Sequence, residues 1–145
     1  MTLEVRNYRP RDRRRCVEIF AAGWAHAFPH IPRAIDTAAF LAETRDERIL
    51  VAVDHGALLG FAGIYPPDDF LHHLYVDPPY HGRGVGRALI EGAHDIVAGR
   101  LNLKCSISNS NARAFYARLG FSEADYGEDQ YGKWVRLRAP LSDRG

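Results

Sequence analysis

The chain has 145 residues, a size typical of one domain, and we expect a single domain over residues 1–145. Its apolar content of 46% and charged content of 26% are those of a globular protein and exclude collagen-like, fibrous and disordered classes. A formal net charge of +1 provides no overall field that would attract nucleic acid or an anionic membrane.

Two cysteines, Cys16 and Cys105, are too few and too far apart for a disulfide framework or a CxxC metal site. The N-terminus lacks the apolar core of a signal peptide, and no apolar run approaches the ~18 residues of a membrane span. Arginines cluster over residues 9–15 without interleaved aromatic residues, which favours a solvated helix start over a nucleic-acid site. We therefore expect a cytoplasmic protein with reduced thiols and no membrane or nucleic-acid partner.

Alternating residues predict a first strand over residues 3–8. From Asp12 the apolar residues follow a helical period, and Pro29 ends that helix. Asp36 is a candidate N-cap for a second, short helix because its carboxylate can accept from the first free N–H groups.

Two strands over residues 49–53 and 58–65 are predicted to be joined by a turn, and a third strand follows over residues 70–76. A glycine-rich loop leads into a helix that we expect to end near Ala98, with Gly99 as its stop. The remaining elements are a strand over 101–105, a helix capped by Asn109 or Ser110, and two strands over 121–128 and 131–138. This order predicts an α/β fold with helices on both faces of a sheet.

The loop after the third of these strands carries Gly82, Gly84 and Gly86 at alternate positions. The first turn of a helix leaves four N–H groups unpaired and carries about half a positive charge. Glycines let the backbone approach an anion, and Arg83 and Arg87 add positive charge nearby. The loop therefore predicts a phosphate site.

Three kinds of phosphate loop share this strand–loop–helix arrangement. A P-loop requires Lys-Ser/Thr after its last glycine, where this chain has Arg-Ala. A Rossmann fingerprint requires a small residue where Arg87 or Leu89 stands. The segment from His81 to Gly86 instead resembles the acyl-CoA loop of the GNAT superfamily of N-acetyltransferases, Gln/Arg-x-x-Gly-x-Gly/Ala. His81 stands in the place of the usual Gln or Arg.

A second block carries the same resemblance. The family's block reads Asn-x-x-Ala-x-x-x-Tyr-x-x-x-Gly-Phe, and Asn109, Ala112, Tyr116, Gly120 and Phe121 stand at this spacing. The order of elements along almost the whole chain also resembles the family. The resemblance implies a single N-acetyltransferase domain of the GNAT type, with a mixed, mostly antiparallel sheet of about seven strands flanked by about four helices.

The resemblance further implies an enzyme that moves an acetyl group from acetyl-CoA directly to a primary amine of a small molecule, amino acid or protein N-terminus. Tyr116 is implied as the general acid, and a tyrosine of pKa about 10 stays protonated at neutral pH. The coenzyme-binding residues that it implies are Leu74, Tyr75, Val76, His81, Gly82, Arg83, Gly84, Val85, Gly86, Arg87, Asn109, Ala112 and Tyr116.

Candidates for the general base are His72 and His73, on the strand that leads to the acetyl group, because histidine can titrate near neutral pH. Alternation sends the two side chains to opposite faces of the sheet, and each could instead be a satisfied or solvated histidine. Lys104 aligns with a glutamate of some family members, but a basic role requires a strongly depressed pKa that we do not expect. Asp68 and Asp69 fit a solvated turn better than an attractor for a cationic amine.

We expect no metal site. Neighbouring histidines at positions 72 and 73 cannot face one ion from a regular strand, and no HExxH or Cys/His spacing is present.

Two alternative functions are compatible with the same fold: an enzyme that uses a longer acyl-CoA donor, or a non-catalytic module that senses acyl-CoA or binds a partner. The presence of Tyr116 together with Asn109 favours the enzyme.

The family places acceptor specificity in the early helices, about residues 23–44, and in the late hairpin near residues 126–134. The aromatic candidates for an acceptor pocket in these segments are Trp24, His26, Phe28, Tyr126 and Tyr131. Core aromatic residues give the same pattern. At the level of the family, the resemblance also implies a homodimer.

Overall fold

The computed structural model describes residues 1–141, so the last four residues of the expected domain lie outside the described part. Its elements in chain order are β1 (Leu3–Asn7), α1 (Arg13–Ala27), α2 (Thr37–Glu43), β2 (Arg48–Asp54), β3 (Ala57–Tyr65), β4 (Phe70–Val76), α3 (Val85–His94), β5 (Asn102–Ser106), α4 (Ser110–Arg118), β6 (Ser122–Asp129) and β7 (Gly132–Arg138). The seven strands form one sheet in the order β1-β2-β3-β4-β5-β7-β6. Its pairs are antiparallel except β4–β5, which confirms the expected mixed, mostly antiparallel sheet.

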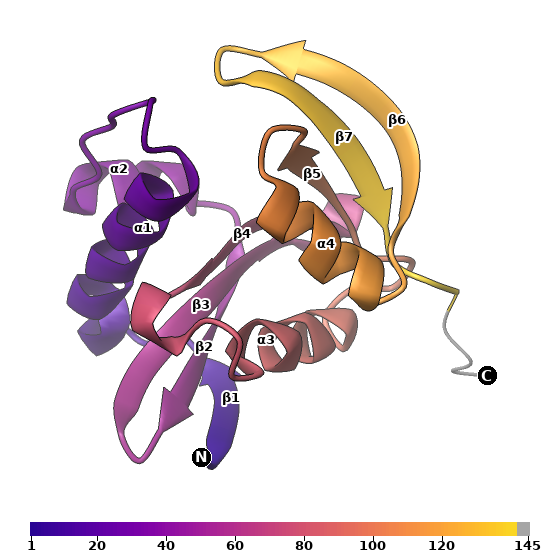
Figure 1. The fold of residues 1–145 in the computed structure, drawn as a ribbon. Coiled ribbons are helices and arrows are strands. Elements are labelled where there is room, and N and C mark those ends of the chain that lie inside the picture. The colour runs from indigo at the N-terminus through magenta and orange to yellow at the C-terminus, as the bar shows by residue number, and fades with distance from the viewer. Residues whose placement is uncertain (142–145) are drawn as a thin grey trace.

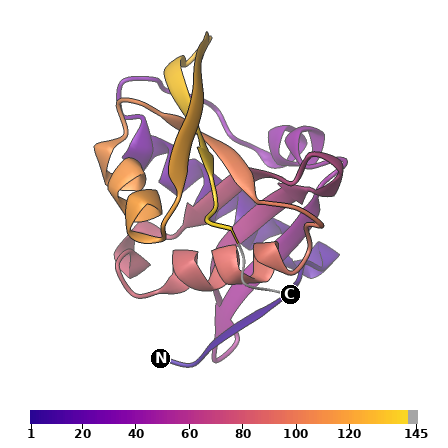
Figure 2. The ribbon, with the colours of Figure 1, turned by 90° about the vertical axis from the view of Figure 1, so that its right-hand side faces the viewer.

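Helices cover both faces of the sheet (Figure 1). One hydrophobic core packs α1 and α2 against the sheet and includes Phe20, Phe40 and Phe61. The other core lies under α3 and α4 and includes Leu89 and Tyr116. In Figure 2, α3 runs in front of the strands and the indigo helix α1 lies behind them. The apolar stripes read along each helix therefore decide which side of the sheet it covers.

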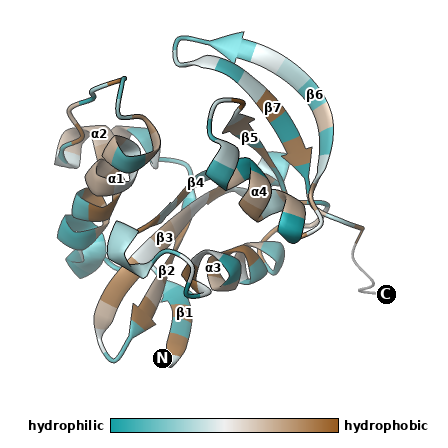
Figure 3. Cartoon of the chain, in the orientation of Figure 1, coloured by the Kyte–Doolittle hydropathy of each residue, from teal (hydrophilic) through white to brown (hydrophobic). Residues whose placement is uncertain are grey.

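The hairpin of β6 and β7 extends beyond the rest of the sheet (Figure 1). Seven of the eight residues of β6 are exposed, and the strand is coloured mostly white to teal in Figure 3. β7 buries Val135 and Leu137 toward the α3/α4 core, so it anchors the hairpin. Within residues 1–141, no helix combines the length and the apolar character that a bilayer span requires.

Helix caps follow the local sequence at α2 and α4. The Asp36 carboxylate accepts from the N–H of Ala39 at 2.8 Å, as expected for an N-cap. Of the two candidates at α4, Asn109 is the N-cap, and its Oδ1 accepts from the N–H of Ala112 at 3.1 Å. Gly120 follows that helix with a φ of +86°, a left-handed conformation that favours glycine.

The expected end of α3 near Ala98 is wrong, because the helix ends at His94. The chain then turns, and Val97 is part of the α3/α4 core. Gly99 is not the helix stop. Its N–H donates to Oδ1 of Asp69 at 3.2 Å, and a Cβ there would lie 2.5 Å from the same carboxylate.

Candidate functional site

Strands β4 and β5 run parallel and diverge. In the described chain their ladder consists of the pair Phe70–Asn102 at the start of both strands. β4 continues to Val76 with pairing to β3 on its other side. Beyond that pair the two strands separate (Figure 1), so the later part of β4 has one edge of backbone N–H and C=O groups that is not paired with β5. Such groups require partners, and an extended ligand can supply them.

The glycine loop follows directly from the open end of β4. Gly82 and Gly84 have φ values of +76° and +84°, which side chains with a Cβ rarely adopt. Gly84 is the N-cap of α3, and the first bond of that helix joins the N–H of Ala88 to the carbonyl of Gly84 at 3.0 Å. The N–H groups of residues 85–87 precede that bond, so they are free of intrahelical partners. The loop therefore has the geometry of an anion site.

Two basic residues flank this loop on its exposed side. The guanidinium of Arg83 lies 5.6 Å from the centre of the Tyr80 ring. Nε of Arg87 lies 3.4 Å from a carboxylate oxygen of Glu91, one turn along α3. Both arginines remain exposed, so an anion at the start of α3 can draw on their charge.

His81 does not extend away from the loop. Its Nε2 lies 2.9 Å from the carbonyl oxygen of Val76 and must donate, because a carbonyl only accepts. Its ring also faces that of His26 at the end of α1, with ring centres 5.0 Å apart. The side chain therefore links the loop to β4. Its Nε2 is already used in this hydrogen bond and is not free to donate to a phosphate.

Tyr116 lies deep beside the two diverging strands. The residue is 8% exposed and packs on the rings of Phe115 and Phe121. Burial raises the pKa of its phenol, and Cys105 on β5 and Tyr75 on β4 raise it further. The phenol is therefore protonated at neutral pH, as a proton donor must be.

His72 and His73 lie side by side, contrary to the expectation of opposite faces. The register of β3 and β4 shifts so that Gly63 pairs with His73 and Ile64 pairs with Leu71. His72 is the extra residue of a β-bulge, which re-aims side chains that regular alternation would separate. The two imidazole centres are 4.0 Å apart.

Both histidines contact one carboxylate. Nδ1 of His72 lies 2.5 Å from one oxygen of Glu47, and Nδ1 of His73 lies 2.9 Å from the other. Nε2 of His73 lies 3.5 Å from Glu43, whose carboxylate also pairs with Arg33. Nothing in the sequence signals this cluster, because Glu43 and Glu47 come from the end of α2 and the connection to β2.

The charged groups of the cluster shift one another's pKa values. Burial by itself lowers the pKa of His73, but the hydrogen bonds to Glu43 and Glu47 outweigh it, and the pKa is raised. Burial by itself raises the pKa of Glu47, but the hydrogen bonds from both histidines outweigh it and the pKa is lowered. The two carboxylates thus favour the protonated form of His73.

Three of the five aromatic candidates for an acceptor pocket come together. Trp24 lies 4.4 Å from Phe28 and 5.0 Å from Tyr131, measured between ring centres. The guanidinium of Arg33 occupies the space beside them, 4.8 Å from the Trp24 ring. Tyr126 is 60% exposed and lies outside this group. The sequence did not predict that Arg33 would lie against the Trp24 ring and pair with Glu43.

The other polar residues considered from the sequence, Lys104, Asp68 and Asp69, contact neighbouring residues of the fold. Nζ of Lys104 lies 4.4 Å from the centre of the Trp134 ring. Asp69 has a left-handed φ of +52° and accepts from Gly99, and the amide of Asn102 donates to the carbonyl of Asp68 at 2.9 Å. These contacts fit the interpretation of residues 68–69 as a turn.

Comparison with known proteins decides the family. Residues 13–121 match the model of the acetyltransferase (GNAT) family. The chain belongs to the GNAT acetyltransferase family. It is 33% identical over 117 residues to the N-alpha-acetyltransferase RimI of Mycobacterium tuberculosis, covering 76% of this chain and 72% of the relative. It is also 33% identical over 115 residues to the [ribosomal protein bS18]-alanine N-acetyltransferase of Escherichia coli, covering 74% of each.

Solved structures agree with this GNAT assignment. A GCN5-related N-acetyltransferase from Rhodopseudomonas palustris superposes with a TM-score of 0.82 at 26% identity, covering 97% of both chains. The PaiA N-acetyltransferase of Thermoplasma acidophilum, solved in complex with coenzyme A, superposes with a TM-score of 0.79 at 21% identity over 95% of this chain and 99% of that one. The expected family, the GNAT-type fold and the assignment as an N-acetyltransferase are confirmed.

Proposed function

We propose that this GNAT enzyme transfers an acetyl group from acetyl-CoA directly to a primary amine, with Tyr116 as the general acid. The observation that carries the proposal is the opening between β4 and β5, which leads to the glycine loop at the start of α3 and has the buried Tyr116 beside it. One ligand with a diphosphate, an extended arm and a reactive end fits these three features in order.

The coenzyme would be bound mainly by backbone groups. Residues 74–76 of β4 would pair with the amides of the pantetheine arm, because this edge of the strand faces the opening. The free N–H groups at the start of α3 and the helix dipole would hold the diphosphate, with Arg83 and Arg87 beside it. Asn109 uses Oδ1 as a helix cap, so the NH₂ of its amide is the group that would contact the arm.

The reaction breaks one bond and forms one. The amine nitrogen attacks the thioester carbon, the C–S bond breaks, and the phenol of Tyr116 donates its proton to the departing thiolate. An alkylamine of pKa about 10.4 is neutral in only ~1 molecule in 2,500 at pH 7, so the nitrogen must also lose a proton. Holding amine and thioester together can contribute ~7–11 kcal/mol in the best cases.

Transfer without an acyl-cysteine intermediate fits the state of the thiols. Cys105 lies near Tyr116, but burial raises the pKa of its thiol to about 11. A buried, protonated thiol is a poor nucleophile. The amine itself is therefore the nucleophile in our proposal.

The proton of the amine would leave to water or to His72. His73 is the weaker of the two candidate bases, because its side chain is 3% exposed and the neighbouring carboxylates raise its pKa, which favours the protonated form. The side chain of His72 is 44% exposed, so solvent can reach it.

The acceptor that we would test first is the N-terminal amine of a peptide. The relatives from Mycobacterium tuberculosis and Escherichia coli are named for N-alpha- and ribosomal-protein alanine N-acetyltransferase activity. We extend that class of acceptor to this chain, with amino acids and small amines as the other candidates.

The decisive experiment combines binding and turnover. Acetyl-CoA should raise the melting temperature of the protein, since a ligand that binds only the folded state stabilises it. Release of free CoA would then be measured across a panel of peptides, amino acids and small amines, with acetyl-CoA and longer acyl-CoA donors. Absence of coenzyme binding at millimolar concentration would overturn the proposal. Binding without turnover of any amine would favour the acyl-CoA-sensing alternative.

A further inference from the structure

Three potential metal ligands converge on the α2 side of β4. One ring nitrogen of each of His72 and His73 and a carboxylate oxygen of Glu47 all lie within 4.8 Å of one another. Two imidazoles and one carboxylate form a ligand set that suits zinc and neighbouring divalent transition metals. The bulge in β4 makes this set, because it brings two consecutive histidines to one carboxylate.

The ligand geometry is supported by a second layer of contacts. Nδ1 of His73 faces Glu47, while Nε2 of the same ring faces the carboxylate of Glu43 at 3.5 Å. Glu43 is held in turn by Arg33. A metal-bound histidine commonly donates its other ring N–H to a carboxylate, which orients the ring and makes it a stronger ligand. Glu43 occupies that position.

Gly63 leaves room for the cluster. A Cβ built on Gly63 would lie 2.1 Å from Oε1 of Glu47 and 3.1 Å from Nδ1 of His73. Any larger residue would push the carboxylate away from the histidine. The close approach of Glu47 and His73 therefore depends on the absence of a side chain at this position of β3.

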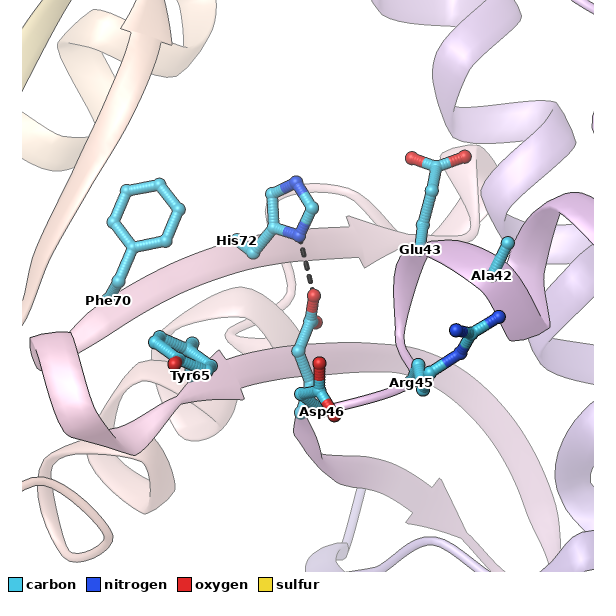
Figure 4. Close-up of a pocket in the computed structure, with 8 residues that line it drawn as sticks. Ala42, Glu43, Arg45, Asp46, Tyr65, Phe70 and His72 are labelled. Atoms are coloured by element: carbon cyan, nitrogen blue, oxygen red, sulfur yellow. Dashed lines mark hydrogen bonds and ion pairs between the residues drawn. The ribbon is translucent and has the colours of Figure 1, made fainter.

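Solvent reaches the ligand set from one side. His72 lines a depression of about 300 Å³ together with Glu43, Asp46 and Phe70. In Figure 4, Phe70 and Tyr65 lie on one side of His72, Glu43 and Arg45 lie on the other, and the dashed line joins His72 to Glu47. The side chain of His72 is 44% exposed, while those of His73 and Glu47 are 3% and 5% exposed. A cation can therefore enter at His72, and the open side leaves a coordination position for water.

We propose that Glu47, His72 and His73 form a binding site for a divalent transition-metal cation of the zinc class, with Glu43 as the carboxylate that orients His73. Zinc takes nitrogen and oxygen ligands at about 2.0–2.2 Å, so neighbouring ligand atoms lie roughly 3.4 Å apart around it. The present contacts of 2.5 Å and 2.9 Å are hydrogen bonds. Binding would replace their protons with the cation and move the exposed ring of His72 outward by about 1 Å.

The sequence argued against a metal because no HExxH or Cys/His spacing is present and because a regular strand separates consecutive side chains. The bulge removes the second premise. The metal site is built from groups on the α2 side of β4 and is tested by binding alone. With the cation bound, His72 is a ligand, so the proton of the amine then leaves to water.

The test uses the full chain without an affinity tag, after treatment with a chelator. Cobalt(II) serves as the probe, because its visible absorption reports the number and kind of its ligands. We expect one equivalent to bind, with a spectrum of four or five nitrogen and oxygen ligands. His72→Gln should weaken binding by at least tenfold while retaining the fold, since this side chain is half-exposed.

Two further variants separate this site from scattered surface binding. Glu43→Gln should weaken cobalt binding by about 10–100-fold without removing a ligand, as loss of an orienting carboxylate does at other metal sites. His55→Asn removes an exposed imidazole on the β2–β3 turn and should leave cobalt binding unchanged. Equal binding by the wild type and His72→Gln, or no binding by the wild type at millimolar cobalt, overturns the proposal.

Discussion

Gly86 at the start of α3 and Phe115 on α4 are in contact. A Cβ built on Gly86 would lie 3.1 Å from Cζ of Phe115. Gly86 belongs to the glycine loop at the start of α3, and Phe115 stands beside Tyr116 on α4. The contact therefore sets the distance between the predicted diphosphate site and the helix that carries the predicted acid.

Gly86→Ala should separate the start of α3 from α4. The added methyl group must displace the Phe115 ring by a few tenths of an ångström, and overpacking of this kind typically costs about 1–3 kcal/mol. We expect a lower melting temperature and weaker acetyl-CoA binding. Combining it with Phe115→Leu should restore part of both, because the two sites are coupled. Strictly additive losses in the double variant would show that the contact does not act in this way.

Tyr116→Phe should slow the chemical step and leave coenzyme affinity nearly unchanged. Removing a general acid typically costs ~10²–10⁴-fold in rate, and the ring that packs in the core is retained. Single-turnover kinetics together with acetyl-CoA titration would separate the two quantities. Tyr126→Phe is the matched control, because that tyrosine is 60% exposed on β6. A rate within a few fold of the wild type would remove Tyr116 from the mechanism.

The His73 cluster predicts a pH dependence of stability. The folded pKa of His73 is raised above 6.5, so its contribution is complete below pH 6.5 and is lost as pH rises through the folded value. The folded pKa of Glu47 is lowered below 4.5, so its contribution is present above pH 4.5 and is lost as pH falls through the folded value. The cluster therefore stabilises the protein most between those limits.

Urea unfolding from pH 5 to pH 9, with a chelator present, would measure this effect. The free energy of unfolding of His73→Gln should fall less steeply above pH 6.5 than that of the wild type. His55→Asn, which alters an 82% exposed histidine, should follow the wild-type profile. Parallel profiles of the wild type and His73→Gln would contradict the assigned pKa shift.

Both thiols should be unreactive in the folded protein. Burial raises the pKa of Cys16 to about 12 and that of Cys105 to about 11, and thiolates rather than thiols attack disulfide reagents. We expect almost no reaction with a chromogenic disulfide at pH 8 until denaturant is added. Cys105→Ala should keep acetyl transfer, and its loss in a variant that remains folded would argue for an acyl-cysteine intermediate.

Local signals in the sequence were sufficient for the order of elements and for the position of the glycine loop. The left-handed φ values at Gly82 and Gly84 and the cap at Asn109 depend on a few neighbouring residues, which a single sequence displays. The same holds for the apolar stripes that place the helices on the two faces of the sheet. The predicted role of Tyr116 as the acid followed from the family resemblance, whereas its place beside Cys105 of β5 and Tyr75 of β4 came from the tertiary structure.

Only the tertiary structure decided what surrounds His72 and His73. The bulge that turns both rings to Glu47 is an extra residue of β4 in its pairing with β3, and it depends on how the two strands pair. Glu43 and Glu47 contact the histidines across 25 to 30 residues of chain, and Arg33 contacts Glu43 from the loop after α1. Such contacts follow from packing. The sequence by itself therefore determined the GNAT-type fold and its glycine loop. The charged cluster on β4 was decided by the tertiary structure, because packing brings together segments that are distant along the chain.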